Sequence, residues 1–168
     1  LVPFAQFGIF VSKYCMVLFV FLSLPTTTAF QHHKTLLSLI ASFMLLLASD
    51  FGTFFGHVLM HRAPILWEFH KVHHSAAVLT PATVYRMHPL DEGLTMVFSG
   101  TCMGVLDACI RYFIFPSYTS YTLYGVSIFM LLFYLFGYVL RHSHVWFSYG
   151  PVLSKIFISP AQHQIHHS

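Results

Sequence analysis

Long apolar runs separated by short polar segments dominate the chain. Residues 118–140 contain no Asp, Glu, Lys or Arg, and residues 36–60 and 93–115 contain one acidic residue each. A helix needs about 20 predominantly apolar residues to cross a bilayer. Residues 4–24 form a fourth candidate, in which the central Lys13 either extends toward the interface or separates two shorter pieces. The pattern predicts an all-α integral membrane protein with about four transmembrane helices.

The polar segments between these runs predict the topology. One histidine-rich segment precedes the pair of spans at 93–140 and another follows it, and the predicted turn of that pair is at residues 116–117. Because two spans return the chain to the face that it left, both His-rich segments should lie on one side of the membrane. His32 and His33 should lie on the other side. We predict one domain, residues 1–168, with a His-rich helical cap on one face of the bilayer.

Composition and charge agree with a membrane protein. Only 8% of the residues are charged, against about 25% in a soluble domain. The net charge of +3 is small and scattered, which excludes a nucleic-acid-binding surface. The basic residues of the His-rich segments are Arg62, Lys71, Arg86, Arg141 and Lys155. By the positive-inside rule this side faces the cytoplasm, in a bacterial inner membrane or the endoplasmic reticulum.

A repeated hexad is the main chemical signal. "HKVHHS" at 70–75 and "HQIHHS" at 163–168 place histidines at positions i, i+3 and i+4, which share one face of a helix. Pro64 precedes the first hexad at a predicted helix start. Ser159, followed by proline and then by Gln162, forms a capping-box pattern before the second hexad. Both hexads are therefore expected to lie on helices.

The histidines together predict a metal site. The two hexads and the pair His57 and His61 supply eight imidazoles, which are costly to bury without partners and are common metal ligands. Because a single zinc takes three or four protein ligands, eight nitrogens suit two neighbouring metals. The segment "HVLMH" lacks the Glu of a hydrolytic HExxH motif, and cysteine ligands are absent. This donor set favours iron and dioxygen chemistry over hydrolysis.

Four segments carry a family resemblance: "DFGTFFGHVLMHRAPILWEFHKVHHS" (50–75), "YRMHPLDE" (85–92), "RHSHVWFSYGP" (141–151) and "SPAQHQIHHS" (159–168). Over about 45–168 the sequence resembles the fatty acid hydroxylase/sterol desaturase superfamily of membrane di-iron oxygenases. The resemblance implies O₂-dependent hydroxylation or desaturation of a lipid C–H bond. It also implies an external electron donor of the cytochrome b5, ferredoxin or reductase type. Members usually continue past the position of Ser168, so we expect a C-terminally truncated chain.

The resemblance also implies the ligands of two iron ions, for which zinc could substitute in purified protein. Carried over by position, these are His57, His61, His70, His73, His74, His163, His166 and His167. His142 matches a lone family histidine after the hairpin, with His144 as the alternative at that place, and His88 is a further candidate ligand. Asp50 lies seven residues before His57 and is expected to accept a hydrogen bond from a ligand imidazole.

The predicted function is that of an oxidoreductase acting on a fatty acyl, sterol or related lipid. The alternative is a membrane metal or haem carrier without enzymatic activity. A bis-His haem site would place single histidines deep in facing spans, whereas these histidines cluster at the ends of the predicted spans.

Overall fold

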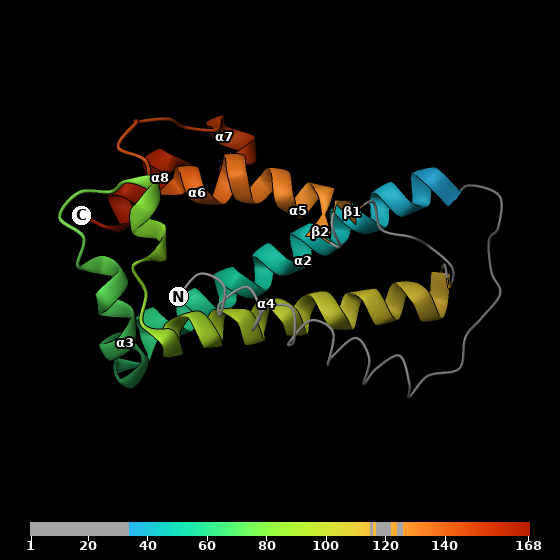
Figure 1. Ribbon diagram of the computed structural model, residues 1–168, viewed down its shortest axis with the longest axis horizontal. Helices are drawn as coiled ribbons and strands as arrows, with labels where there is room; N and C mark the ends of the chain where they lie inside the picture. The colour runs from blue at the N-terminus through green and yellow to red at the C-terminus, as the bar shows by residue number, and fades with distance from the viewer. Residues whose placement is uncertain (1–33, 115, 117–121, 124–125) are drawn as a thin grey trace. The chain divides into compact units, whose positions relative to one another are not determined.

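A computed structural model of the chain describes residues 34–168 except 115, 117–121 and 124–125 (Figure 1). The predicted span at 4–24, together with His32 and His33, lies outside the described residues. The chain divides into two compact units. The first unit comprises Leu1–Val58 and Glu92–Phe129, and the second comprises Leu59–Asp91 and Met130–Ser168.

Two long apolar helices account for most of the described first unit. Helix α2 runs from Lys34 to Arg62, and α4 runs from Pro89 to Cys109 and continues as the π-helical turn η2, Ile110–Ile114. Within them, Leu36–Arg62 and Pro89–Ile114 are long and apolar enough to cross a membrane. The predicted spans at 36–60 and 93–115 therefore correspond to continuous helices.

In the first unit, α2 and α4 pack through small residues and aromatic rings. The hydroxyls of Ser49 and Ser99 form a hydrogen bond of 2.7 Å. Nearly two turns farther along α2, the Phe55 ring meets Phe98 edge-on, with the ring centroids 5.4 Å apart. Gly52 lies between these contacts, and its missing side chain lets the two backbones approach closely, as is common for helices packed in a bilayer.

Gly52→Ala should therefore destabilise the packing of α2 on α4. A Cβ at this position would lie 2.5 Å from the carbonyl oxygen of Phe98 and 2.7 Å from the Ser99 Cα, so the backbones must separate. We expect a loss of about 1–3 kcal/mol in unfolding free energy, measured by denaturation in detergent micelles. Gly93→Ala is the matched control, because a Cβ there meets nothing within 4 Å. Equal stability of the two variants would contradict this account of the packing.

The predicted span at 118–140 is wrong in its first part. Strands β1, Thr122–Leu123, and β2, Val126–Ser127, form a short antiparallel pair, and all other described elements are helical, in agreement with the all-α prediction. The helix begins at Ile128 and continues through α5, Ile128–Phe133, η3, Tyr134–Tyr138, and α6, Val139–Arg141. Tyr and Thr are abundant before Ile128, and these residues favour extended backbone. What remains is a shorter apolar helix, Ile128–Arg141.

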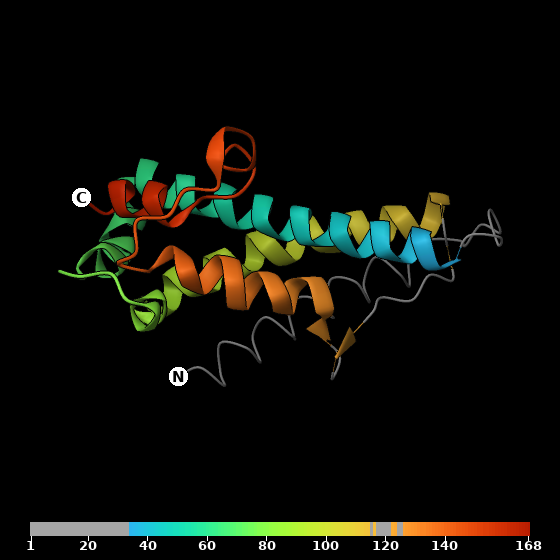
Figure 2. The same cartoon turned by 90° about the horizontal axis from the view of Figure 1, so that it is seen from above.

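Short helices make up the rest of the second unit. They are α3, Pro64–His74; η1, Pro81–Tyr85; α7, Gly150–Leu153; and α8, Pro160–His166. Both predicted helix starts are confirmed: Pro64 opens α3, and Ser159 and Gln162 form the reciprocal capping box of α8. Helix α8 contacts α6, so the C-terminal hexad packs against the end of the Ile128–Arg141 helix (Figure 2).

Candidate metal centre

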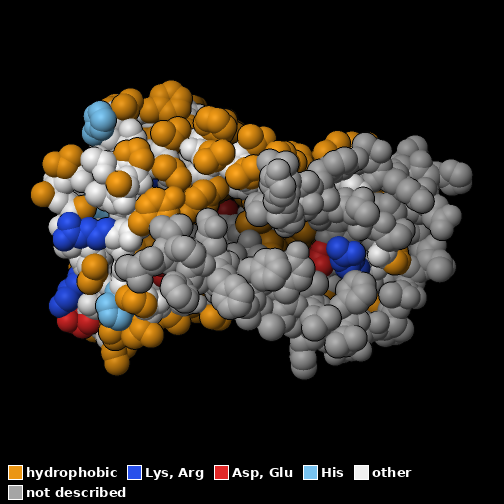
Figure 3. Space-filling model, in the orientation of Figure 1, with side chains coloured by type: hydrophobic (Ala, Val, Ile, Leu, Met, Phe, Trp, Pro, Cys, Tyr) orange, Lys and Arg blue, Asp and Glu red, His pale blue; other side chains and the backbone are white. Residues whose placement is uncertain are grey.

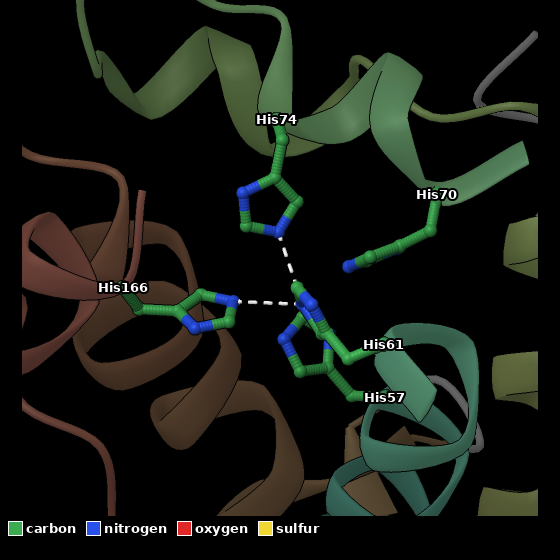
Figure 4. A group of neighbouring side chains, drawn as sticks. All are labelled: His57, His61, His70, His74 and His166. Atoms are coloured by element: carbon green, nitrogen blue, oxygen red, sulfur yellow. Dashed lines mark hydrogen bonds between the residues drawn. The ribbon is translucent and has the colours of Figure 1, made fainter. Parts of the chain in front are cut away.

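The structure gathers nine histidines into two groups whose ring nitrogens lie within 4.8 Å of one another inside each group. Group one contains His57, His61, His70, His74 and His166 (Figure 4). Group two contains His73, His142, His163 and His167. These are the nine histidines predicted from the three boxes and the lone position after the hairpin.

Each hexad contributes to both groups. In the first hexad, His70 and His74 lie in group one, whereas His73 lies in group two. The second hexad reverses the assignment, because its i and i+4 histidines join group two and His166 joins group one. Each residue advances a helix by about 100°. Seen down the helix axis, the side chain at i+4 is therefore rotated about 40° from that at i in one direction, and the side chain at i+3 is rotated in the opposite direction. One short helix can therefore supply two neighbouring sites.

The nitrogens of group one converge on a common point. His61 Nε2 lies 3.1 Å from His74 Nε2 and 3.1 Å from His166 Nε2 (Figure 4). A neutral imidazole nitrogen has either one proton or one lone pair, so a single Nε2 cannot form two good hydrogen bonds with such neighbours. A cation between the three nitrogens would interact favourably with a lone pair from each of them.

The spacing in group two is compatible with a shared metal ion. His163 Nε2 lies 2.9 Å from His142 Nε2 and 3.1 Å from His167 Nε2. With metal–nitrogen bonds of about 2.1 Å, ligands of one ion are about 3.0–3.4 Å apart. The residues of group two therefore lie close enough together to bind one ion.

The two groups adjoin. The rings of His74 and His167, one from each group, are stacked with centroids 4.2 Å apart. Three of the four residues of group two are buried, whereas only His70 is buried in group one. Two metal positions would therefore be close neighbours, with group one the more accessible.

A buried carboxylate orients one imidazole of group one. Asp91 Oδ2 lies 2.8 Å from His70 Nδ1, and both side chains are fully buried. The Nδ1–H group donates to the carboxylate, so the lone pair of this imidazole is on Nε2, the nitrogen available to a metal. The sequence pattern predicted no role for Asp91 at this site. The signal that could have found it is its position in the first turn of α4, three residues after His88.

A threonine fixes the corresponding imidazole of group two. The Thr83 hydroxyl donates to the Thr80 carbonyl oxygen at 2.7 Å, so its proton is already used. Its oxygen, 3.0 Å from His142 Nδ1, therefore accepts the proton of that nitrogen. The lone pair of His142 is then on Nε2, which faces His163. Nothing in the local sequence pattern pointed to Thr83, because η1 brings it to His142 from a distant part of the chain.

Burial keeps the imidazoles neutral. Burial and the neighbouring imidazoles lower the pKa of His73 to about 2 and that of His74 to about 3. Burial, followed by the Arg141 guanidinium, lowers the pKa of His142 to about 4. Burial and the surrounding imidazoles also lower the pKa of His163. At neutral pH these side chains are in the form that binds metals.

Acid should therefore destabilise the metal-free protein. Below about pH 6.5 the unfolded chain binds protons that the folded histidines exclude, so stability falls as the pH drops from about 6.5 toward about 4. We expect the thermal unfolding midpoint in chelator to fall by roughly 5–10 °C between pH 7 and pH 5. His144→Gln is the control and should leave the profile unchanged. A thermal unfolding midpoint that stays constant or rises toward pH 5 would contradict the neutral state assigned to these histidines.

Three other predicted or alternative site residues lie outside both groups. His88 accepts a hydrogen bond from the Leu90 backbone N–H at 3.2 Å, and its ring packs on Phe69, so it caps the start of α4. His144 is exposed, so of the two alternatives after the hairpin only His142 joins a group. Asp50 is half-buried on α2, and its predicted bond to a ligand imidazole stays a prediction.

Comparison with known proteins places this arrangement in a family. Residues 42–168 match the fatty acid hydroxylase family. The chain is 29% identical to ornithine lipid hydroxylase OlsE of Rhizobium tropici over 73% of this chain and 33% of that protein. It is 28% identical to an alkylglycerol monooxygenase of Caenorhabditis elegans over 70% of this chain and 20% of that protein. For the alkylglycerol monooxygenase of Homo sapiens, the identity is 29% over 72% of this chain and 23% of that protein.

The chain spans a third or less of the length of these relatives. No solved structure matches it significantly. The matched region nevertheless covers most of the chain and includes all nine grouped histidines. The chain therefore belongs to the fatty acid hydroxylase family.

Proposed function

We propose that this chain forms the catalytic centre of a membrane monooxygenase that hydroxylates an unactivated C–H bond of a lipid. The observation that supports this most strongly is the pair of adjoining groups of neutral imidazoles, five in one and four in the other. Iron is the proposed metal, because imidazole ligands suit it and the family resemblance implies it. The ligands would be the nine grouped histidines, without His88.

Two bound iron ions would supply the activation of O₂, according to the balance R–H + O₂ + 2 e⁻ + 2 H⁺ → R–OH + H₂O. The protein supplies the geometry. The nine imidazoles present lone pairs toward two adjoining points, and Asp91 and Thr83 fix the tautomers of His70 and His142. The two electrons would come from an external electron donor, as the family resemblance implies.

Hydroxylation is proposed over desaturation because the relatives are named a hydroxylase and monooxygenases, and those names refer to lipids. The helix Leu36–Arg62 supports a bilayer location, since it can span the membrane and bears His57 and His61 at its end. That arrangement would hold the metals at the membrane surface, where a C–H bond of a lipid chain can reach them. We place this surface on the cytoplasmic side by the positive-inside rule, in a multi-pass protein.

Labelled oxygen provides the test. Membranes from cells that express the full-length gene are incubated with ¹⁸O₂ and a reductant, and the extracted lipids are analysed by mass spectrometry. The wild type should add one ¹⁸O atom to a lipid, and the double variant His73→Ala/His166→Ala, which damages both groups, should not. Equal labelling in the two samples, or no labelled lipid in the wild type, would contradict the proposal.

A further inference from the structure

A cavity opens beside group one in the second unit. Its volume is about 410 Å³, and it is lined by His61, Arg62, Pro64 and Trp67. These residues lie at the end of α2 and in the first turn of α3, immediately after the helix that can span a membrane. Group one is also the less buried of the two groups. The cavity therefore connects the surface with the accessible side of the candidate metal centre.

The indole of Trp67 lines this cavity and also packs against the imidazoles of group one. Its ring centroid is 5.2 Å from that of His61 and 5.4 Å from that of His74. The ring of His70 is 6.1 Å away. One aromatic side chain thus contacts three imidazoles of group one and also lines the open cavity. A half-buried π-system that lines the cavity and contacts metal-ligand candidates offers a short path for electrons.

The charges around this cavity favour an acidic partner. In the described part of the second unit, the exposed charged side chains are Arg62, Glu68, Lys71, Arg86 and Lys155. Glu68 forms an ion pair with Lys71, and the other acidic residue, Asp91, is buried. The accessible charge is therefore positive, and Figure 3 shows Lys and Arg side chains exposed at the end of the molecule where α3 lies. Such a surface attracts a negatively charged protein surface.

We propose that the cavity lined by Arg62 and Trp67 is the docking and electron-entry site for an acidic one-electron carrier protein. This inference rests on the proposed function, since it names the place where that reaction receives its two electrons. Arg62 would bind a carboxylate of the carrier, and the Trp67 indole would bridge the carrier's cofactor to group one, without itself being oxidised. The cavity suits such a contact better than an acyl chain, because hydrocarbon requires a mostly apolar lining.

The test separates electron delivery from the oxidation reaction. The full-length, iron-loaded protein in nanodiscs is reduced by a plant-type [2Fe–2S] ferredoxin, and the reduction of iron is followed by stopped-flow absorbance. Trp67→Leu should slow this reduction about tenfold or more, because the bridging π-system is gone. The control is Trp146→Leu, since Trp146 is the other tryptophan of the chain and lies exposed in the loop after α6. It should leave the rate unchanged.

Hydrogen peroxide bypasses the carrier, since R–H + H₂O₂ → R–OH + H₂O needs no external electrons. Trp67→Leu should retain the wild-type iron content and peroxide-driven product while losing ferredoxin-driven product. If this variant loses iron, Trp67→Phe, which keeps a ring beside the imidazoles, takes its place. A metal-replete variant reduced by ferredoxin at the wild-type rate overturns the inference. Failure of the wild type with both ferredoxin and peroxide would instead overturn the proposed function.

Arg62→Gln tests the docking step. It should raise the KM for ferredoxin about tenfold at low salt and weaken the salt dependence of reduction, with the lipid KM unchanged. Arg86→Gln, which removes an exposed charge elsewhere in the second unit, should have a much smaller effect. A raised KM for lipid with an unchanged KM for ferredoxin would show that the cavity holds a lipid headgroup and would overturn the inference.

Discussion

His163→Ala should lower the bound iron from two ions to about one per chain and reduce lipid hydroxylation at least a thousandfold. His163 Nε2 is the nitrogen of group two that contacts both His142 and His167, so its loss removes the centre of that group. Three remaining imidazoles bind a metal weakly, and in the proposed reaction O₂ activation requires both ions. Removal of an essential catalytic group typically costs about 10³-fold or more in rate. Iron is counted by mass spectrometry, and product is measured by lipid analysis.

His166→Ala is the matching change in group one, within the same hexad. It should also leave about one ion per chain, but the retained ion should be in the more buried position. Chelator should then remove the remaining ion more slowly from His166→Ala than from His163→Ala. His88→Ala is the control, because His88 caps α4 outside both groups, and it should keep both ions. Loss of both ions from each single variant would show one shared site rather than two.

The grouping of the nine histidines could be predicted from the sequence because the signal was local. Spacings of i, i+3 and i+4 have fixed directions once a helix forms, and Pro64 and Ser159 marked where those helices begin. The sequence alone did not show that each hexad is divided between two groups. That division depends on the angle at which α3 and α8 approach each other, which is set by packing of the whole second unit.

The residues that orient the imidazoles were harder to predict. Asp91 and Thr83 are separated from their histidines by 21 and 59 residues. Neither belongs to a repeated pattern, so only the tertiary structure identifies them. The local spacing on α2 pointed to Asp50, which shares a helix with His57, and its bond to a ligand imidazole stays a prediction.

The predicted span at 118–140 failed for a related reason. Hydropathy reflects the free energy of transferring side chains out of water, and it does not distinguish a helix from extended backbone. The Tyr- and Thr-rich segment before Ile128 is apolar enough to pass as part of a span, yet its described residues pair as strands. Only the part after Ile128, rich in Leu, Phe and Met, is helical.

Asp91→Ala should weaken iron binding to group one by about 10–100-fold, the usual cost of removing a carboxylate that orients a ligand histidine. The carboxylate accepts the Nδ1 proton of His70 at 2.8 Å in a fully buried position. Without an acceptor, that imidazole can change tautomer and place its proton on Nε2, the nitrogen that faces the other histidines. Affinity is measured by competition with a fluorescent chelator, and hydroxylation should fall in proportion to the iron lost.

Asp91→Asn distinguishes the orienting role from a purely structural one. The amide oxygen still accepts from His70 Nδ1, so this variant should recover part of the affinity, whereas Asp91→Ala should not. Glu68→Gln is the matched control, since Glu68 is an exposed carboxylate that pairs with Lys71, and it should bind iron normally. Asp50→Asn tests the competing assignment. A larger loss of iron affinity in Asp50→Asn than in Asp91→Asn would mean that the carboxylate on α2, rather than the one at the start of α4, controls the centre.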